Sequence, residues 1–111
     1  MSGEISERRN QIRFNLRAPV NYSWTDSAGA VHCGEGITRD ISSHGVYVRA
    51  EWRPPTDAHI HVDISLPSLL ETNKTLVMTG KAKVVRVEVP LPDENSGGFV
   101  ARSGSFLLET K

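Results

Sequence analysis

Two short polar clusters hold the side chains of this sequence that could do chemistry. The first occupies residues 8–13 and reads Arg-Arg-Asn-Gln-Ile-Arg, so Arg9 and Arg13 form an RxxxR pair with Arg8 directly before it. Guanidinium groups are planar and donate hydrogen bonds in pairs, which suits phosphate oxygens and the O6/N7 edge of guanine. Taken alone, this spacing also fits a solvated basic tail.

The second cluster, residues 40–45, reads Asp-Ile-Ser-Ser-His-Gly and has the pattern DxSxxG. An ionised Asp40 accepts hydrogen bonds from the N1–H and N2 amine of guanine, an edge that adenine lacks. Ser42 adds a short hydroxyl contact, and Gly45 lets the backbone approach a ligand closely. Alone, the pattern also fits an ordinary turn between strands, with His44 as a surface turn residue. Together the clusters predict a site that reads guanine on both edges and holds a phosphate.

The elements that must position these clusters are strands, because the apolar residues recur with a period of two. From His59 to Leu66 the alternation is strict, and it places Ile60, Val62 and Ile64 on a buried face. Further strands are expected at 18–25, 31–40, 46–51, 75–87 and 98–103, with turn signals between them. Residues 69–73 could form a single helical turn at most. Short strands at this spacing predict an all-β barrel or sandwich.

Composition sets further limits on function. The 111 residues suffice for one domain, and 13 Lys and Arg balance 13 Asp and Glu, so no overall field attracts a long polyanion. Basic residues outnumber acidic ones before Ala18, and such a confined basic arm suits a small anionic ligand. Cys33 is the only cysteine, which excludes a disulfide framework. No apolar run has the length of a membrane span, and residues 1–12 are too polar for a signal peptide, so we expect a cytoplasmic protein.

The order and separation of RxxxR and DxSxxG, with their flanks, resemble the PilZ domain family, whose members bind the bacterial second messenger cyclic di-GMP. Pro19-Val20 follows the first motif as in the family's opening strand, and Gly45 to Val48 continues the second into a strand. Residues 80–87 and 97–101 resemble the family's last strands, so the likeness runs from about residue 7 to 107. It implies a small antiparallel six-stranded β-barrel (13–111), a flexible basic N-terminal arm (1–12), and at most a short C-terminal helix.

The resemblance also implies a mechanism and a set of ligand-binding residues. Ligand binding would order the arm against a wall held by the barrel, and the ordered arm would signal to a protein partner in motility, pilus, biofilm or envelope regulation. A basic residue just before RxxxR is similar to the pattern of members that take an intercalated pair of cyclic di-GMP molecules. No catalytic residues, metal site or further cofactor are implied. The implied ligand-binding residues are Arg8, Arg9, Arg13, Asp40, Ser42 and Gly45.

Two other functions remain open from the sequence. One is a PilZ-like adaptor that binds a protein without the nucleotide; the intact motifs count against it. The other is a small β-barrel that binds single-stranded nucleic acid, which needs exposed aromatic residues and a continuous basic groove. Tyr22 and Trp24 share one face of the first strand, and we expect them to pack inside the barrel.

Several other residues have a simpler structural interpretation. Arg86 and Arg102 in the late strands are either ordinary exposed charges or face the ligand. His59, His61 and Asp63 share one strand face, but their spacing is too wide for one metal ion. Where many family members continue into a C-terminal helix, this sequence stops soon after Leu108, which leaves the lid or docking role of such a helix open. Phe106 and Leu107 could still plug the open end of the barrel.

Overall fold

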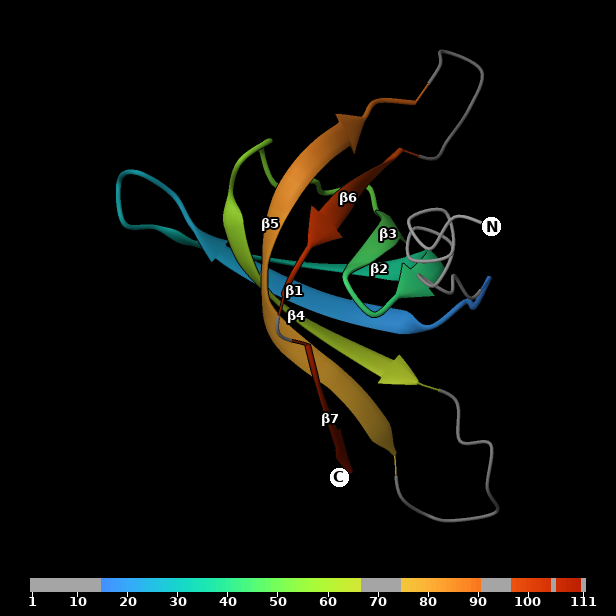
Figure 1. Cartoon of the computed structure of the whole chain (residues 1–111). Coiled ribbons are helices and arrows are strands. Elements are labelled where there is room, and N and C mark those ends of the chain that lie inside the picture. The colour runs from blue at the N-terminus through green and yellow to red at the C-terminus, as the bar shows by residue number, and fades with distance from the viewer. Residues whose placement is uncertain (1–14, 67–74, 91–96, 105, 111) are drawn as a thin grey trace, which may run out of the picture.

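Seven antiparallel strands make up the protein in a computed structural model that describes residues 15–66, 75–90, 97–104 and 106–110. These residues contain no helix, and Figure 1 shows the strands wrapping around a common centre. The all-β prediction is therefore confirmed. The strands are β1 (Pro19–Thr25), β2 (Val31–Ser42), β3 (Gly45–Arg49), β4 (His59–Leu66), β5 (Leu76–Glu88), β6 (Gly98–Arg102) and β7 (Leu107–Thr110).

Six of the strands close into a barrel, as predicted. Their order is β4-β1-β2-β3-β6-β5, and the β4–β5 pairing joins the two ends. The long strand β5 makes this closure possible, because its first half pairs with β4 and its second half with β6. In Figure 1, β5 curves across the whole barrel, and β7 lies against its first half.

The structure differs from the predicted strands at the end of β2 and at the C-terminus. Strand β2 extends to Ser42, so Asp40 and Ser42 lie in the strand and only Ser43 and His44 form the turn. At the C-terminus, residues 107–110 form a strand, which pairs with the first four residues of β5. Phe106 packs against the core as expected, but Leu107 is 62% exposed, so its expected role as a barrel plug is wrong.

Alternate residues of each strand fill the barrel. Ile60, Val62 and Ile64 are buried, as the period of two predicts. Tyr22 stacks at a centroid distance of 6.1 Å on Trp24 and meets Phe99 edge-on at 5.0 Å, which confirms the expected packing role of the β1 aromatic residues.

Gly34 on β2 makes room for the ring of Tyr22. Tyr22 is paired with Gly34, and a Cβ atom at Gly34 would lie only 2.5 Å from the tyrosine ring. The hydroxyl of Tyr22 then reaches across the barrel end to donate a hydrogen bond to the carbonyl of Trp52. Because Gly34 has no side chain, β1 can place the Tyr22 ring directly against β2.

One buried hydroxyl fastens the beginning of the described chain to β2. Thr38 is 1% exposed, and its Oγ1 accepts a hydrogen bond of 2.8 Å from the amide of Ala18 while donating to the carbonyl of Leu16. The Thr38 amide in turn donates to the Ala18 carbonyl at 2.9 Å. Residues 16–18 are thus held beside the middle of β2, two residues before Asp40.

Replacing Thr38 by Val should destabilise the barrel by about 1–3 kcal/mol, because the isosteric side chain leaves the buried amide of Ala18 and the Leu16 carbonyl without their partner. The free energy of unfolding from urea denaturation measures this. Thr38→Ser keeps the hydroxyl and is expected to lose less. Equal stabilities of Thr38→Val and the wild type would show that the hydroxyl contributes nothing to the fold.

The Tyr22 hydroxyl gives a prediction at alkaline pH. Burial raises the pKa of Tyr22 from 10.0 to about 12, partly opposed by the positive charge of Arg53. Since the folded state holds this proton more tightly than the unfolded chain, stability should fall as pH rises from about 10 to about 12. The loss attributable to Tyr22 is at most about 3 kcal/mol. Tyr22→Phe should lack this part of the decline in urea unfolding, whereas parallel curves for both proteins would contradict the assignment.

Candidate functional site

A β-bulge in β2 places the acidic residue of the second motif on the outer surface. Thr38 pairs with Val48 but Asp40 pairs with Tyr47, so Arg39 is an extra residue on the β2 side. Thr38 and Ile41 both point into the core. The two residues between them, Arg39 and Asp40, therefore face outward side by side. In a regular strand Asp40 would share the face of Thr38 and point inward.

A second bulge interrupts β5 opposite the first. Val84 pairs with Ala101 and Arg86 with Val100, which leaves Val85 unpaired. Val84 is buried, while Val85 and Arg86 are exposed. The two bulged strands flank β3 and β6, and between them lies a hollow of about 250 Å³. It is lined by Arg39, Asp40, Ser42, His44, Gly45, Val46, Tyr47, Val85, Arg86, Val100 and Arg102.

The strand register explains why the second motif forms one side of this hollow. Asp40 lies beside Tyr47, followed by Val100 and Arg86, in a single row across β2, β3, β6 and β5. The next row on the same outer face contains Ser42, Gly45, Arg102 and Lys83. The structure thus brings Asp40, Ser42 and Gly45 together, and it adds Arg86 and Arg102, which the sequence left undecided.

Gly45 and Ser42 shape the turn at one end of the hollow. A Cβ atom at Gly45 would lie 3.1 Å from the Ala101 carbonyl, so the close approach of β6 favours glycine here. Among the described glycines only Gly29 has a positive φ, so the conformational argument does not apply to Gly45. The Ser42 hydroxyl donates to the Gly45 carbonyl and accepts from the His44 amide, each at 3.3 Å.

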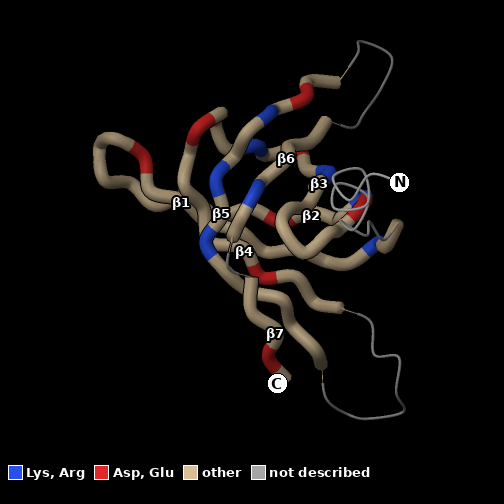
Figure 2. The backbone as a smooth tube through the Cα atoms, viewed as in Figure 1, with Lys and Arg blue, Asp and Glu red and all other residues tan. Residues whose placement is uncertain are grey.

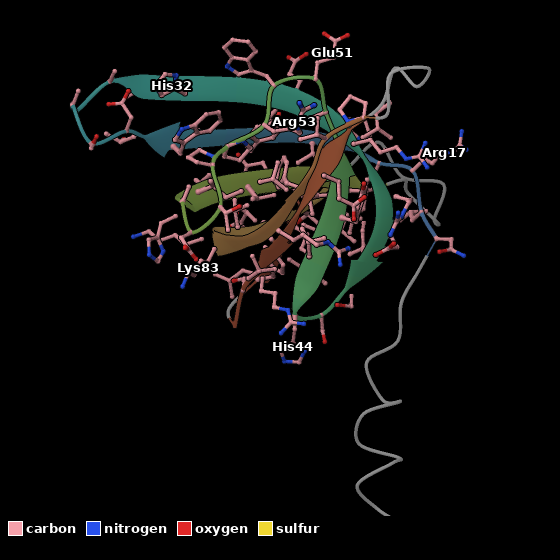
Figure 3. The ribbon with its side chains drawn as sticks, turned by 90° about the horizontal axis from the view of Figure 1, so that it is seen from above. Arg17, His32, His44, Glu51, Arg53 and Lys83 are labelled. Atoms are coloured by element: carbon pink, nitrogen blue, oxygen red, sulfur yellow. The ribbon has the colours of Figure 1, made fainter. Side chains whose placement is uncertain are left out.

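His44 is confirmed as a surface turn residue. It is exposed, and Figure 3 shows its ring at the tip of the β2–β3 turn, directed away from the strands. Its backbone has a structural role, because the His44 carbonyl accepts a 2.9 Å hydrogen bond from the Ser103 amide. The side chain bonds only to its neighbour Ser43, at 2.9 Å, among the contacts within the described chain.

A connected set of side chains runs from Asp40 to Arg86, and all of its members except Glu88 line the hollow. The Arg39 guanidinium lies 3.7 Å from the centroid of the Tyr47 ring, and its Nε donates to Asp40 Oδ2 at 3.1 Å. The Tyr47 hydroxyl donates to Glu88 Oε1 at 2.7 Å, and Arg86 Nη2 lies 3.0 Å from Glu88 Oε2. The roles of Arg39, Tyr47 and Glu88 were not predicted from the sequence, since contacts between separate strands leave no pattern along the chain.

These contacts change the ionisation of two groups. Burial raises the pKa of Tyr47, with a further contribution from its hydrogen bond to Glu88. The hydrogen bond from Tyr47 lowers the pKa of the exposed Glu88 carboxyl, and the charge of Arg86 adds to the effect. At neutral pH the pair therefore consists of a protonated phenol that donates to an ionised carboxylate.

The charge around the hollow is mainly positive. Figure 2 shows basic positions recurring along β5, and the register places Lys83 and Arg86 of β5 and Arg102 of β6 on the face that also carries Arg39. Arg102 forms no ion pair with another described residue. Of the two carboxylates in this set, Asp40 alone lines the hollow, where the guanidinium groups can hold an anion while Asp40 accepts hydrogen bonds from it.

A wider open depression of about 990 Å³ adjoins the hollow along the outer face of β1, β2 and β3. Arg39 lines both, and Arg17, Arg49, Glu35 and Glu51 are among the other residues of the depression. Figure 3 shows Arg17 well away from His44, so the two recesses extend in different directions from Arg39.

The arginines of the first motif, Arg8, Arg9 and Arg13, lie outside the described residues. Their place in the sequence is nevertheless informative. Leu16 and Ala18 follow Arg13 within five residues and are bonded to Thr38, which directly precedes the bulge. The chain that carries RxxxR therefore joins the barrel next to the strand that carries DxSxxG.

The outer face of β4 holds the polar residues that were considered for a metal. His61 Nε2 lies 3.2 Å from Asp63 Oδ1, and the Thr79 hydroxyl donates to the same oxygen at 2.5 Å. In the part of the chain described, no three His, Cys, Asp or Glu side chains are arranged to hold a metal ion. The same residues include no helix long and apolar enough to cross a membrane.

Comparisons with known proteins agree with this architecture. The inhibitor of motility MotI/DgrA from Bacillus subtilis has a similar structure, with a TM-score of 0.68 over 90% of this chain and 17% sequence identity. The match spans 44% of that protein's length, and at this low sequence identity the likeness is one of fold. No curated protein sequence matches significantly. The family model of the PilZ domain matches residues 7–94, which include both motifs and most of the barrel. The chain therefore belongs to the PilZ domain family.

Proposed function

We propose that this protein is a cyclic di-GMP sensor that binds its ligand on the outer face of β2, β3, β6 and β5. The observation that carries the proposal is the position of Asp40, which the β2 bulge directs outward into a hollow rimmed by Arg39, Arg86 and Arg102. A guanine base has two adjacent donors for one carboxylate, and the phosphates of the same ligand suit the guanidinium groups.

In this proposal each residue of the site has a separate role. Asp40 is 21% exposed and accepts the N1–H and N2 amine of a guanine. Arg102, which lacks an ion-pair partner among the described residues, faces the phosphates together with Arg9 and Arg13 of the first motif. Ser42 holds the turn through its hydrogen bonds, and Gly45, which has no side chain, leaves room for the ligand at the edge of the hollow.

The signalling step follows from the way the chain joins the barrel. Thr38 fixes residues 16–18 beside the second motif, so a ligand on Asp40 is within reach of the segment that carries Arg9 and Arg13. Binding would order this arm over the ligand, and the new surface would be recognised by a protein partner. The structurally similar protein MotI/DgrA is an inhibitor of motility, so a protein of motility regulation is a suitable class of partner to test.

A barrel that binds single-stranded nucleic acid is less well supported. That function needs aromatic rings on the surface for bases to stack on. Tyr22 and Trp24 are buried inside the barrel, and Tyr47 is covered by Arg39. Among the described aromatic residues only Trp52, in the loop after β3, is largely exposed, and a single ring does not make a stacking platform.

The proposal is tested by calorimetric titration with cyclic di-GMP and cyclic di-AMP. The wild type should bind cyclic di-GMP and prefer it. Asp40→Ala should lose most of this preference, by about tenfold or more, because the mutant has no acceptor for the guanine donors. Asp63→Ala, a carboxylate on the outer face of β4, is the matched control and should keep it. No binding by the wild type, or an unchanged preference in Asp40→Ala, would contradict the proposal.

The stoichiometry gives a second test. One cyclic di-GMP carries two phosphate charges and a stacked pair carries four, so a pair needs further cations. Arg8 supplies one, and the depression beyond Arg39 leaves space for a second ligand. We therefore expect two ligands per chain at saturation, and a shift toward one in Arg8→Leu. A wild-type equivalence point of one in titrations far above the dissociation constant would refute the paired ligand.

A further inference from the structure

Arg39 is held flat by the ring beneath it. Its guanidinium carbon lies 3.7 Å from the Tyr47 centroid, within the range of a cation–π contact. The Arg39 side chain is still 45% exposed, so the ring covers one face and the rest opens into the hollow. A guanidinium restrained in this way loses less freedom when it makes a further contact.

Tyr47 is itself fixed from two sides. Its hydroxyl is bonded at 2.7 Å to Glu88, which Arg86 holds at 3.0 Å from the other side. Its ring lies over Gly98, where a Cβ atom would come within 2.9 Å of Cε1. Although it points to the outer face of β3, Tyr47 is only 6% exposed. A phenol is protonated at neutral pH, so the hydroxyl stays a donor to Glu88.

The end of this chain of contacts is the Asp40 carboxylate. Arg39 Nε donates to Oδ2 at 3.1 Å, which restrains the rotation of a carboxylate that is partly exposed. Each carboxylate oxygen has two lone pairs. No described residue bonds to Oδ1, so Oδ1 and the second lone pair of Oδ2 can accept hydrogen bonds from two parallel donors. An acceptor held in one orientation binds such a donor pair with a smaller entropic cost.

We propose that Tyr47 and Arg39 are positioning residues that orient Asp40 for guanine recognition, with Glu88 anchoring Tyr47 from β5. This inference rests on the proposed function, since it names the residues that set the selectivity of the same site. It ties the two bulged strands together, because the carboxylate on β2 is held through a ring on β3 by a carboxylate on β5.

Selectivity, rather than affinity alone, tests this role. The probes are cyclic di-GMP and its inosine analogue cyclic di-IMP, which lacks the N2 amine. Arg39→Gln and Tyr47→Leu should weaken cyclic di-GMP binding by about tenfold and cyclic di-IMP binding by less, so the ratio of the two dissociation constants shrinks. Tyr47→Phe keeps the ring under Arg39 and should keep most of the ratio.

Lys81→Gln is the matched control for charge. Lys81 is exposed on the half of β5 that pairs with β4 and lines neither the hollow nor the depression, so its removal should leave the ratio unchanged. A purely structural role of Arg39 and Tyr47 would lower the affinity for both ligands equally. An unchanged ratio in both Arg39→Gln and Tyr47→Leu would therefore overturn the inference.

A measurement without ligand separates this inference from the proposed function. In the wild type and Tyr47→Phe, the Nε–H proton of Arg39 should give an NMR signal protected from solvent exchange, whereas Tyr47→Leu should lose it. Protection that survives Tyr47→Leu would disprove the positioning contact whatever the protein binds. If the contact is present but the wild type binds neither dinucleotide, the proposed function fails and the recognition role fails with it.

Discussion

The outward turn of Asp40 depends on two inward anchors three residues apart. Thr38 is held in the core by hydrogen bonds with residues 16–18, and Ile41 is held there by apolar packing. A regular strand cannot place residues three apart on one face, so β2 must accommodate an additional residue between them. The bulge at Arg39 is the result, and it delivers a basic and an acidic side chain to the surface together.

The chemistry of the hollow follows from this constraint and its counterpart in β5. Each bulge exposes an arginine, and the paired strands between them contribute Tyr47 and Arg102. Two carboxylates lie on this otherwise basic face, and each has a guanidinium partner whose opposite charge favours the ionised form. The site therefore combines positive charge for an anion with a restrained acceptor for a base edge.

Much of the fold could be predicted because it depends on local pattern. The period of two located the six barrel strands to within a few residues and placed Ile60, Val62 and Ile64 inside. The grouping of Asp40, Ser42 and Gly45 followed from their motif. The available signal for the bulge was the spacing of Thr38 and Ile41, which breaks the alternation, but a buried threonine is recognised only once its partners are known.

The contacts that join distant strands could not be predicted. Tyr47 and Glu88 are 41 residues apart, and their hydrogen bond depends on the register of β3, β6 and β5. The same applies to Arg86 and Arg102, which no sequence pattern places on the Asp40 face. Strand β7 was missed because four exposed residues lack an alternating pattern.

Mapping the ligand by NMR tests the central claim most directly. On addition of cyclic di-GMP to the labelled protein, we expect amide shifts to concentrate in residues 39–47, 85–86 and 100–102, in the strands that surround the hollow. Residues on the outer face of β4 and at the far end of β1, such as His61, Asp63 and Ser23, should be unaffected. Shifts concentrated on that second face, or no shifts at all, would contradict it.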